Sequence, residues 1–75
     1  MSTLRRETIE YLRESFPSGC RVEILRMDDP KAPPVGTLGT VIGVDDVGTI
    51  HVNWDNGSGL GVAYGEDECR RIDND

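Results

Sequence analysis

The sequence has few apolar residues in succession, and it contains no long apolar run of the kind that a membrane protein has. No stretch approaches the roughly 20 apolar residues that span a bilayer, and no apolar segment near the N-terminus is typical of a signal peptide. We therefore expect a cytoplasmic protein. With 75 residues the chain has room for one domain at most, whose core is small and whose stability is marginal.

Basic residues are also in short supply, with 8 Lys and Arg against 14 Asp and Glu and a net charge of −6. Proteins that bind nucleic acid through its phosphates carry a basic excess, so the composition disfavours that class. The charge is uneven, because residues 1–18 are neutral overall and residues 19–75 carry all of the net negative charge. The sequence therefore predicts a neutral N-terminal segment and an acidic body.

Cysteine and histidine are nearly absent. The two cysteines are too few for the disulfide framework of a small secreted domain. Cys20 and Cys69 would need His51 and a carboxylate to complete a four-ligand zinc site. A domain this small also has little room for a water-excluding pocket around a nucleophile and a base. We expect two reduced, partly buried thiols, no cofactor and no enzymatic activity.

The N-terminal segment, residues 1–18, is expected to form an amphipathic helix that a proline ends. The positions before Pro17 contain no Gly or other Pro, and the residue before a proline avoids the α region. Such a short helix is not stable alone in water, so its apolar stripe must be covered. We favour packing on the rest of the chain over packing on a partner. The stripe consists of Ile9, Leu12 and Phe16, which recur at helical spacing, and Leu4 and Tyr11 lie near the same face.

Polar residues support the same helix. Ser2 or Thr3 offers an N-cap oxygen to the free N–H groups of the first turn. Arg6 and Glu10, and also Glu10 and Arg13, have the spacing of exposed ion pairs on one helix face.

From residue 19 onward, apolar and polar residues alternate, which is typical of half-buried strands. A long loop at residues 28–36 contains three prolines. A turn is expected at 45–48, a type I′ turn at Asn56-Gly57, one helical turn at 65–68, and a frayed tail at 73–75. The predicted strands cover residues 20–25, 38–44, 49–55, 60–64 and 69–72.

Five short strands, a long first loop and a single turn before the last strand predict a mainly β fold. We expect a small five-stranded SH3-like antiparallel barrel over residues 19–72, with an N-terminal α-helix. In that topology the first and last strands are neighbours, which would bring Cys20 near Cys69. A disulfide between them is geometrically conceivable, but a reducing compartment opposes it.

The alternation of apolar and polar residues also indicates which side chains of a strand face the core. Trp54 is in phase with the apolar residues of the third predicted strand and belongs in the core, whereas His51 faces the other way. Gly39 and Gly43 in the second strand suggest bending or close backbone approach. Proline-rich peptides bind grooves lined by several exposed aromatic side chains. Tyr64 alone makes no such groove, so ordinary SH3-type ligand binding is disfavoured.

Four ordered motifs resemble a known family. These segments are residues 16–23, 26–30, 33–41 and 52–58, and the resemblance extends over about residues 16–72. The family is a small bacterial domain of unknown function, found in gut Firmicutes and their phage and conjugative elements. The resemblance implies a mobile-element setting and a small independent domain, and it assigns no activity.

Runs of adjacent acidic residues and of glycines raise the question of a calcium site and a dinucleotide site, but the spacing of these residues fits neither. Asp28-Asp29, Asp45-Asp46 and residues 66–68 lack the Asp-x-Asp-x-Asp-Gly pattern of a calcium loop, so we interpret them as turn formers and expect no metal. The glycines at 57–61 lie between two strands, whereas a dinucleotide site needs a helix after its glycines.

One electrostatic feature is a possible basic strip, because arginines lie on both the first and the last predicted strand. The acidic residues gather instead at the loops. Pairing of these arginines with neighbouring carboxylates is the interpretation we favour over binding of a polyanion. The candidate interaction residues are Arg21, Arg26, Arg70, Arg71, Asp28, Asp29, Asp45 and Asp46.

The sequence therefore favours a non-enzymatic protein-interaction or accessory module of a bacterial or mobile-element system, with a protein as its partner. The alternative is a nucleic-acid-associated protein, or an acidic inhibitor of a nucleic-acid-handling enzyme. A small metal-binding protein or enzyme is a third and weaker alternative.

Overall fold

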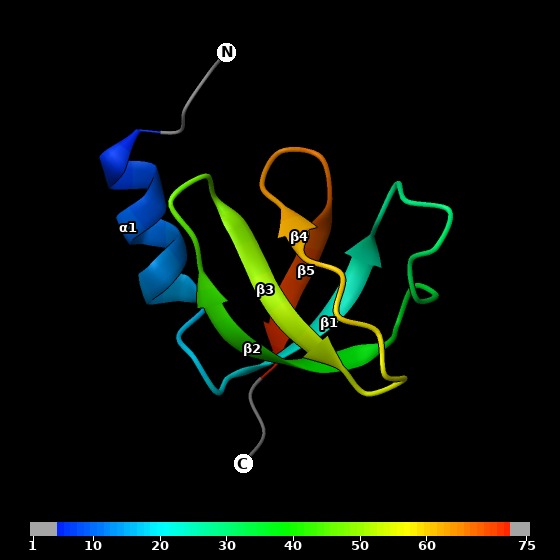
Figure 1. Ribbon diagram of the computed structural model, residues 1–75. Helices are drawn as coiled ribbons and strands as arrows, with labels where there is room; N and C mark the ends of the chain where they lie inside the picture. Colours follow the sequence, from blue (N-terminus) through cyan, green and yellow to red (C-terminus); the bar gives the residue numbers. More distant parts are fainter. Residues whose placement is uncertain (1–4, 73–75) are drawn as a thin grey trace.

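The computed structural model describes residues 5–72, which form one helix and one five-stranded sheet (Figure 1). The strand order is β4-β3-β2-β1-β5, and each strand is antiparallel to its neighbours. The predicted mainly β architecture is confirmed. The proposed cap residues Ser2 and Thr3 and the tail lie outside the described residues, and the N-cap of the helix is Arg5, which makes no side-chain cap hydrogen bond. The elements are α1 (Arg6–Ser15), β1 (Arg21–Arg26), β2 (Leu38–Val44), β3 (Thr49–Trp54), β4 (Val62–Ala63) and β5 (Glu68–Ile72).

Helix α1 packs on the sheet through its apolar stripe, as favoured. Leu12 is only 1% exposed and belongs to the central cluster of buried side chains. Arg13 extends to the turn between β2 and β3, where its Nη2 lies 2.8 Å from Asp46 Oδ1. The predicted Arg6–Glu10 pair is present, but the predicted partner of Arg13 was wrong, because Asp46 holds that side chain instead of Glu10. In residues 5–72, no helix is long and apolar enough to cross a membrane.

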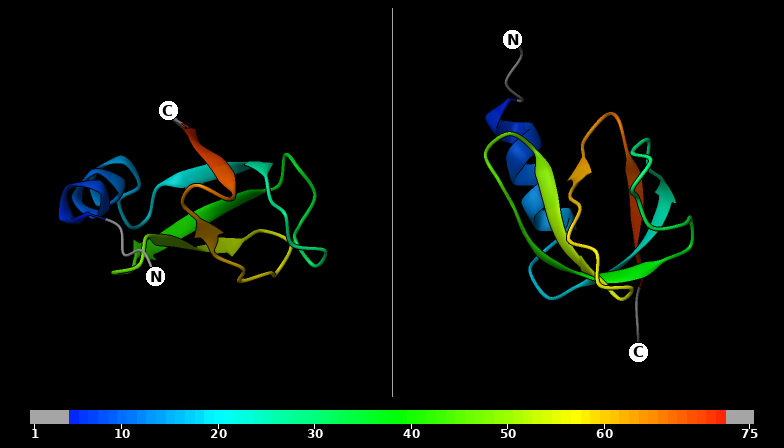
Figure 2. Two further views of the ribbon diagram at one scale, coloured as in Figure 1. Left: turned by 90° about the horizontal axis from the view of Figure 1, so that it is seen from above. Right: turned by 45° about the vertical axis from the view of Figure 1, so that its right-hand side comes forward.

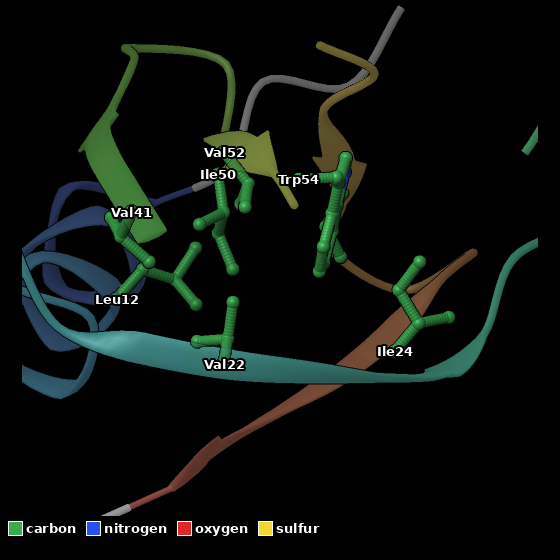
Figure 3. Close-up of a cluster of buried hydrophobic side chains, with 8 residues drawn as sticks. Leu12, Val22, Ile24, Val41, Ile50, Val52 and Trp54 are labelled. Atoms are coloured by element: carbon green, nitrogen blue, oxygen red, sulfur yellow. The ribbon is translucent and has the colours of Figure 1, made fainter. Parts of the chain in front are cut away.

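The core lies inside the curl of the sheet, between β1 and β3, and Leu12 of α1 enters it from one side (Figure 3). Alternate residues of β1, β2, β3 and β4 contribute to it, in agreement with the two-residue period. Trp54 is 3% exposed, and its indole N–H donates to the carbonyl oxygen of Leu60 at 2.8 Å. The predicted core position of Trp54 is therefore confirmed. The buried strand residues are Val22, Ile24, Val41, Ile50, Val52, Trp54 and Val62.

The two glycines of β2 have different roles. A Cβ on Gly39 would lie 2.6 Å from Trp54 Cε3 and 2.7 Å from Val52 Cγ1, so this position requires close backbone approach. A Cβ on Gly43 would meet nothing within 4 Å. Gly43 instead follows a β-bulge at Ile42, where the register between β2 and β3 shifts. Of the two roles predicted for these glycines, Gly39 has the close backbone approach and Gly43 lies at the bend.

Several local predictions were wrong. The Asn56-Gly57 turn is not type I′, because among residues 5–72 only glycines have positive φ. Gly57 has φ +95° and Trp54 N–H donates to Ser58 O, as in a longer loop that ends in a glycine bulge. Strand β4 covers two residues rather than 60–64. The expected helical turn at 65–68 is a tight turn, because Gly65 has φ +90°.

The sheet curls so that β4 and β5, its two outer strands, lie across from one another (Figure 2). Within residues 5–72 the only β-bridge between the two segments joins Tyr64 and Asp67, beside the connecting turn. The hydrogen-bonded sheet is therefore open between β4 and β5.

Strand β1 pairs with β5, as predicted, but the two cysteines are not opposite each other. Cys69 lies opposite Ile24, and Cys20 lies four residues before Ile24, so the two cysteines are offset along the paired strands. Both thiols are free, so the disulfide that the topology suggested does not form.

Candidate functional site

The predicted arginines of β1 and β5 are largely engaged within the chain. Arg21 holds Asp55 through two bonds, with Nη2–Oδ2 at 2.6 Å and Nη1–Oδ1 at 3.0 Å, and its Nη1 also donates to Thr40 Oγ1 at 2.9 Å. Arg70 lies opposite Glu23, with Nη2 at 2.7 Å from Oε1. The pairing with carboxylates that we favoured is therefore present at both positions.

The four arginines are also divided between two faces of the sheet. Arg71 lies opposite Val22, whose side chain is in the core, so Arg71 is on the inner face at its rim. Arg70 is on the outer face, since successive residues of a strand alternate. Arg26 donates from Nη2 to the carbonyl oxygen of Glu66 at 3.0 Å. The pairing of β1 with β5 therefore does not gather the arginines into one continuous strip.

Asp45 and Asp46 organise the turn between β2 and β3. Asp45 Oδ1 accepts from the N–H groups of Val47 at 3.1 Å and Thr49 at 2.9 Å. Its Oδ2 lies 2.8 Å from Nε2 of His51. The hydrogen bond with His51, followed by the one with Thr49, lowers the pKa of Asp45. Asp46 pairs with Arg13, so these two carboxylates stabilise the turn and attach the helix to it.

Asp28 and Asp29 lie in the loop that follows β1. Asp29 Oδ1 accepts from the N–H of Lys31 at 2.7 Å, and the N–H of Asp28 donates to Asp67 Oδ1 at 3.2 Å. Across residues 5–72, no group of three or more His, Cys, Asp or Glu side chains is arranged to hold a metal ion. These aspartates act as loop formers in the structure.

The two thiols are poor nucleophiles. Burial, followed by the neighbouring Cys20, raises the pKa of Cys69 to about 11. Burial also raises the pKa of Cys20, although Arg71 opposes that shift. Both side chains are therefore protonated at neutral pH, and the thiol is far less reactive than the thiolate.

Sequence reasoning missed a cleft of about 410 Å³ between α1 and the turn that joins β4 to β5. The helix contributes Tyr11, Phe16 follows directly after the helix, and the opposite wall carries Tyr64. Ile50 and Val62, both almost fully buried, also line it. The cleft therefore combines a hydrophobic interior with aromatic walls.

Two exposed tyrosines flank this cleft from distant parts of the chain. Tyr11 is 61% exposed and Tyr64 is 49% exposed. Tyr11 was expected near the face of the apolar stripe, and it lies exposed at the edge of that stripe. The two tyrosines reach one cleft only through tertiary packing, in which α1 lies on β2 and the sheet curls. Tyr64 is two residues after the buried Val62, so alternation places it in phase with the core, and no sequence signal marks either tyrosine as exposed.

The wall that carries Tyr64 is fixed by hydrogen bonds. Asp67 Oδ2 accepts from the N–H of Ala63 at 3.1 Å, and the N–H groups of Asp67 and Glu66 donate to the carbonyl oxygen of Ala63. Arg26 joins the same turn through Glu66 O. Because these bonds already exist in the free chain, the cleft is preformed, which lowers the entropic cost of binding.

Comparison with known proteins gives a family and no activity. No curated protein and no solved structure matches the chain. A family described as a domain of unknown function, DUF4314, matches residues 5–72, which include the helix and all five strands. The resemblance noted in the sequence is thereby confirmed, and the chain belongs to the DUF4314 family of domains of unknown function.

Proposed function

We propose that this domain is a non-enzymatic interaction module that binds another protein in the cleft between α1 and the β4–β5 turn. The observation that carries the proposal is the pair of exposed tyrosines, Tyr11 and Tyr64, beside a hydrophobic cleft. Aromatic side chains supply large contact areas at low entropic cost, and tyrosine is enriched in binding interfaces. A volume of about 410 Å³ lies within the range of binding pockets.

The chemistry of the remaining polar residues supports a non-enzymatic role. The raised pKa of Cys69 keeps the thiol protonated, and Cys69 is the one thiol in the cleft lining. Nε2 of His51 is occupied by Asp45 on the turn that precedes β3. This histidine does not line the cleft. The cleft thus combines apolar surface with a protonated thiol, and its lining contains no histidine.

The charge distribution favours a protein over a nucleic acid as the partner. Arg21 and Arg70 are neutralised by Asp55 and Glu23, and the chain carries a net charge of −6. A polyanion would have to displace these carboxylates and approach an acidic domain.

The proposal also includes the type of β fold, an SH3-like barrel, and the biological setting of the domain. The order β4-β3-β2-β1-β5 places the first and last strands side by side, as an SH3-like barrel requires, and β4 lies across from β5. Free thiols suit the reducing cytoplasm. The bacterial, mobile-element setting rests on the sequence resemblance.

The test is capture of a partner from a host extract by three immobilised forms of the full chain. These are the wild type, the double variant Tyr11→Ala/Tyr64→Ala, and a control, Val47→Ala, which removes an exposed apolar side chain from the β2–β3 turn. We expect the wild type and the control to retain the same protein and the double variant to lose it. Equal capture by all three forms, or capture of nothing above background, would contradict the proposal. Trp54 fluorescence verifies that each variant is folded.

A further inference from the structure

The ionised groups lining the cleft are not balanced, because they comprise one cation, Arg26, and two carboxylates, Asp67 and Glu68. Arg26 donates to Glu66 O, and Asp67 accepts from two backbone N–H groups. Glu68 also lines the cleft and is exposed. Within residues 5–72, the side chains of Glu68 and Glu66 have no ion-pair partner. The lining therefore carries a net charge of −1, and Glu66, which precedes Asp67 in the same turn and lies outside the lining, adds a further negative charge beside it.

The helix face that carries Tyr11 also bears two glutamates, which lie outside the cleft lining. Glu7 lies four residues before Tyr11 and Glu14 lies three residues after it, so all three share a helix face. Both glutamates are exposed and have no ion-pair partner among residues 5–72, whereas Arg6 and Arg13 are paired. Uncompensated carboxylates thus lie near both exposed tyrosines.

Exposed tyrosine rings beside carboxylates form a surface that recognises cations. A guanidinium or ammonium group is attracted to the face of an aromatic ring and pairs with a carboxylate in the same position. From this arrangement we infer that the cleft binds a cationic peptide segment. A Lys or Arg side chain of that segment lies against Tyr11 or Tyr64 and pairs with Glu68, while a neighbouring apolar side chain contacts Ile50 and Val62. This inference rests on the proposed function of the cleft.

The inference has an electrostatic consequence. A segment with Lys and Arg approaches an acidic domain with a favourable long-range attraction, which raises the association rate and weakens as salt is added. An acidic segment of the same apolar content is repelled by Glu66 and Glu68. Charge therefore sets specificity in the cleft, and the apolar contacts hold the segment in place.

The test begins with selection of binders from a random peptide library on the immobilised full chain, with counter-selection on the variant Tyr64→Ala. We expect peptides that depend on Tyr64 and are enriched in Lys or Arg next to an aromatic or aliphatic residue. Peptides that depend on Tyr64 but are neutral or acidic would overturn the cationic inference and leave the proposed function intact. A selection that yields no peptide dependent on Tyr64 would contradict both.

A second measurement uses the strongest selected peptide and fluorescence anisotropy. The variant Glu66→Gln/Glu68→Gln removes one carboxylate of the lining and one beside it. The control Asp29→Asn removes one charge outside the cleft lining and keeps an oxygen that can accept from Lys31 N–H. We expect the double variant to bind roughly two- to fivefold more weakly per lost carboxylate, with a smaller salt dependence, and the control to bind as the wild type. Equal loss in the control and the double variant, or no loss in either, would overturn the inference.

Discussion

Gly39 lies directly against the indole ring of Trp54. A Cβ at position 39 would come within 2.6 Å of Trp54 Cε3 and 2.9 Å of the Asn53 carbonyl oxygen, closer than such atoms approach in proteins. The ring therefore packs on the backbone of β2, and its N–H bond to Leu60 O fixes its other edge. This contact joins β2, β3 and the segment that leads into β4.

The variant Gly39→Ala is expected to lose about 1–3 kcal/mol of unfolding free energy, because the added methyl group overpacks the core. Chemical denaturation followed by Trp54 fluorescence measures the change. The matched control is Gly43→Ala in the same strand, where a Cβ meets nothing within 4 Å and φ is not positive. We expect the control to stay within about 1 kcal/mol of the wild type. Equal losses in the two variants would show that Gly39 is not held by its contact with Trp54.

Acid is expected to weaken the fold through Asp45 and Asp55. Hydrogen bonds with His51 and with Arg21 lower the pKa values of these two carboxyl groups below their ordinary values. A group with a lowered pKa in the folded state contributes stability above its unfolded pKa of about 4, and this stability is lost as the pH falls through the folded value. The unfolding free energy should therefore decrease below about pH 4.

The variant Asp45→Asn tests this assignment by denaturation across the acid range. Its unfolding free energy should be lower than that of the wild type at neutral pH. This free energy should also decrease less as the pH falls, because the variant has no carboxylate to protonate at that site. The control Asp29→Asn removes an equal charge from the loop after β1 and should retain the acid response of the wild type. Parallel pH profiles for Asp45→Asn and the wild type would rule out the role of Asp45.

Alkylation should be slow at Cys69 in the folded protein. A pKa of about 11 instead of 9.0 lowers the thiolate fraction at neutral pH by roughly 100-fold, and burial also restricts access. We expect iodoacetamide to modify Cys69 at least that much more slowly in the native chain than in denaturant, with Cys20→Ala used to isolate its signal. Equal rates in the two conditions would contradict the buried position of Cys69.

Nucleic acid should not bind through β1 and β5. Arg21 and Arg70 are already paired with Asp55 and Glu23. We expect no retention of DNA or RNA in a gel-shift assay, including at low salt, where phosphate contacts are strongest. Salt-sensitive retention that is lost in the variant Arg70→Ala/Arg71→Ala would replace the protein-binding proposal with the nucleic-acid alternative.

The sequence predicted the parts of the fold that depend on local pattern. Alternation along β3 placed Trp54 in the core, and Pro17 marked the end of the helix region. The Asn56-Gly57 pair located a turn but not its type, because the backbone conformation of Asn56 depends on how the flanking residues pair. β4 is short because Leu60 uses its carbonyl oxygen to satisfy the Trp54 indole.

The candidate site could not be predicted from the sequence, because it depends on contacts between residues that are distant in the chain. Tyr11 and Tyr64 are brought together by the packing of α1 and the curl of the sheet, and neither has a neighbour in the chain that marks it. The arginines illustrate the same limit. Pairing of β1 with β5 followed from the predicted topology, but the partnership of Arg21 with Asp55 depends on the position of the loop after β3.

The central claim is that the cleft beside Tyr11 and Tyr64 is the binding site. The most direct measurement is a chemical-shift titration of the isotope-labelled full chain with the captured partner or the strongest selected peptide. The account predicts that the largest shift changes occur at residues lining the cleft, among them Tyr11, Tyr64 and Glu68. Changes centred on the outer face around Arg21 and Arg70, with the cleft signals unmoved, would contradict it.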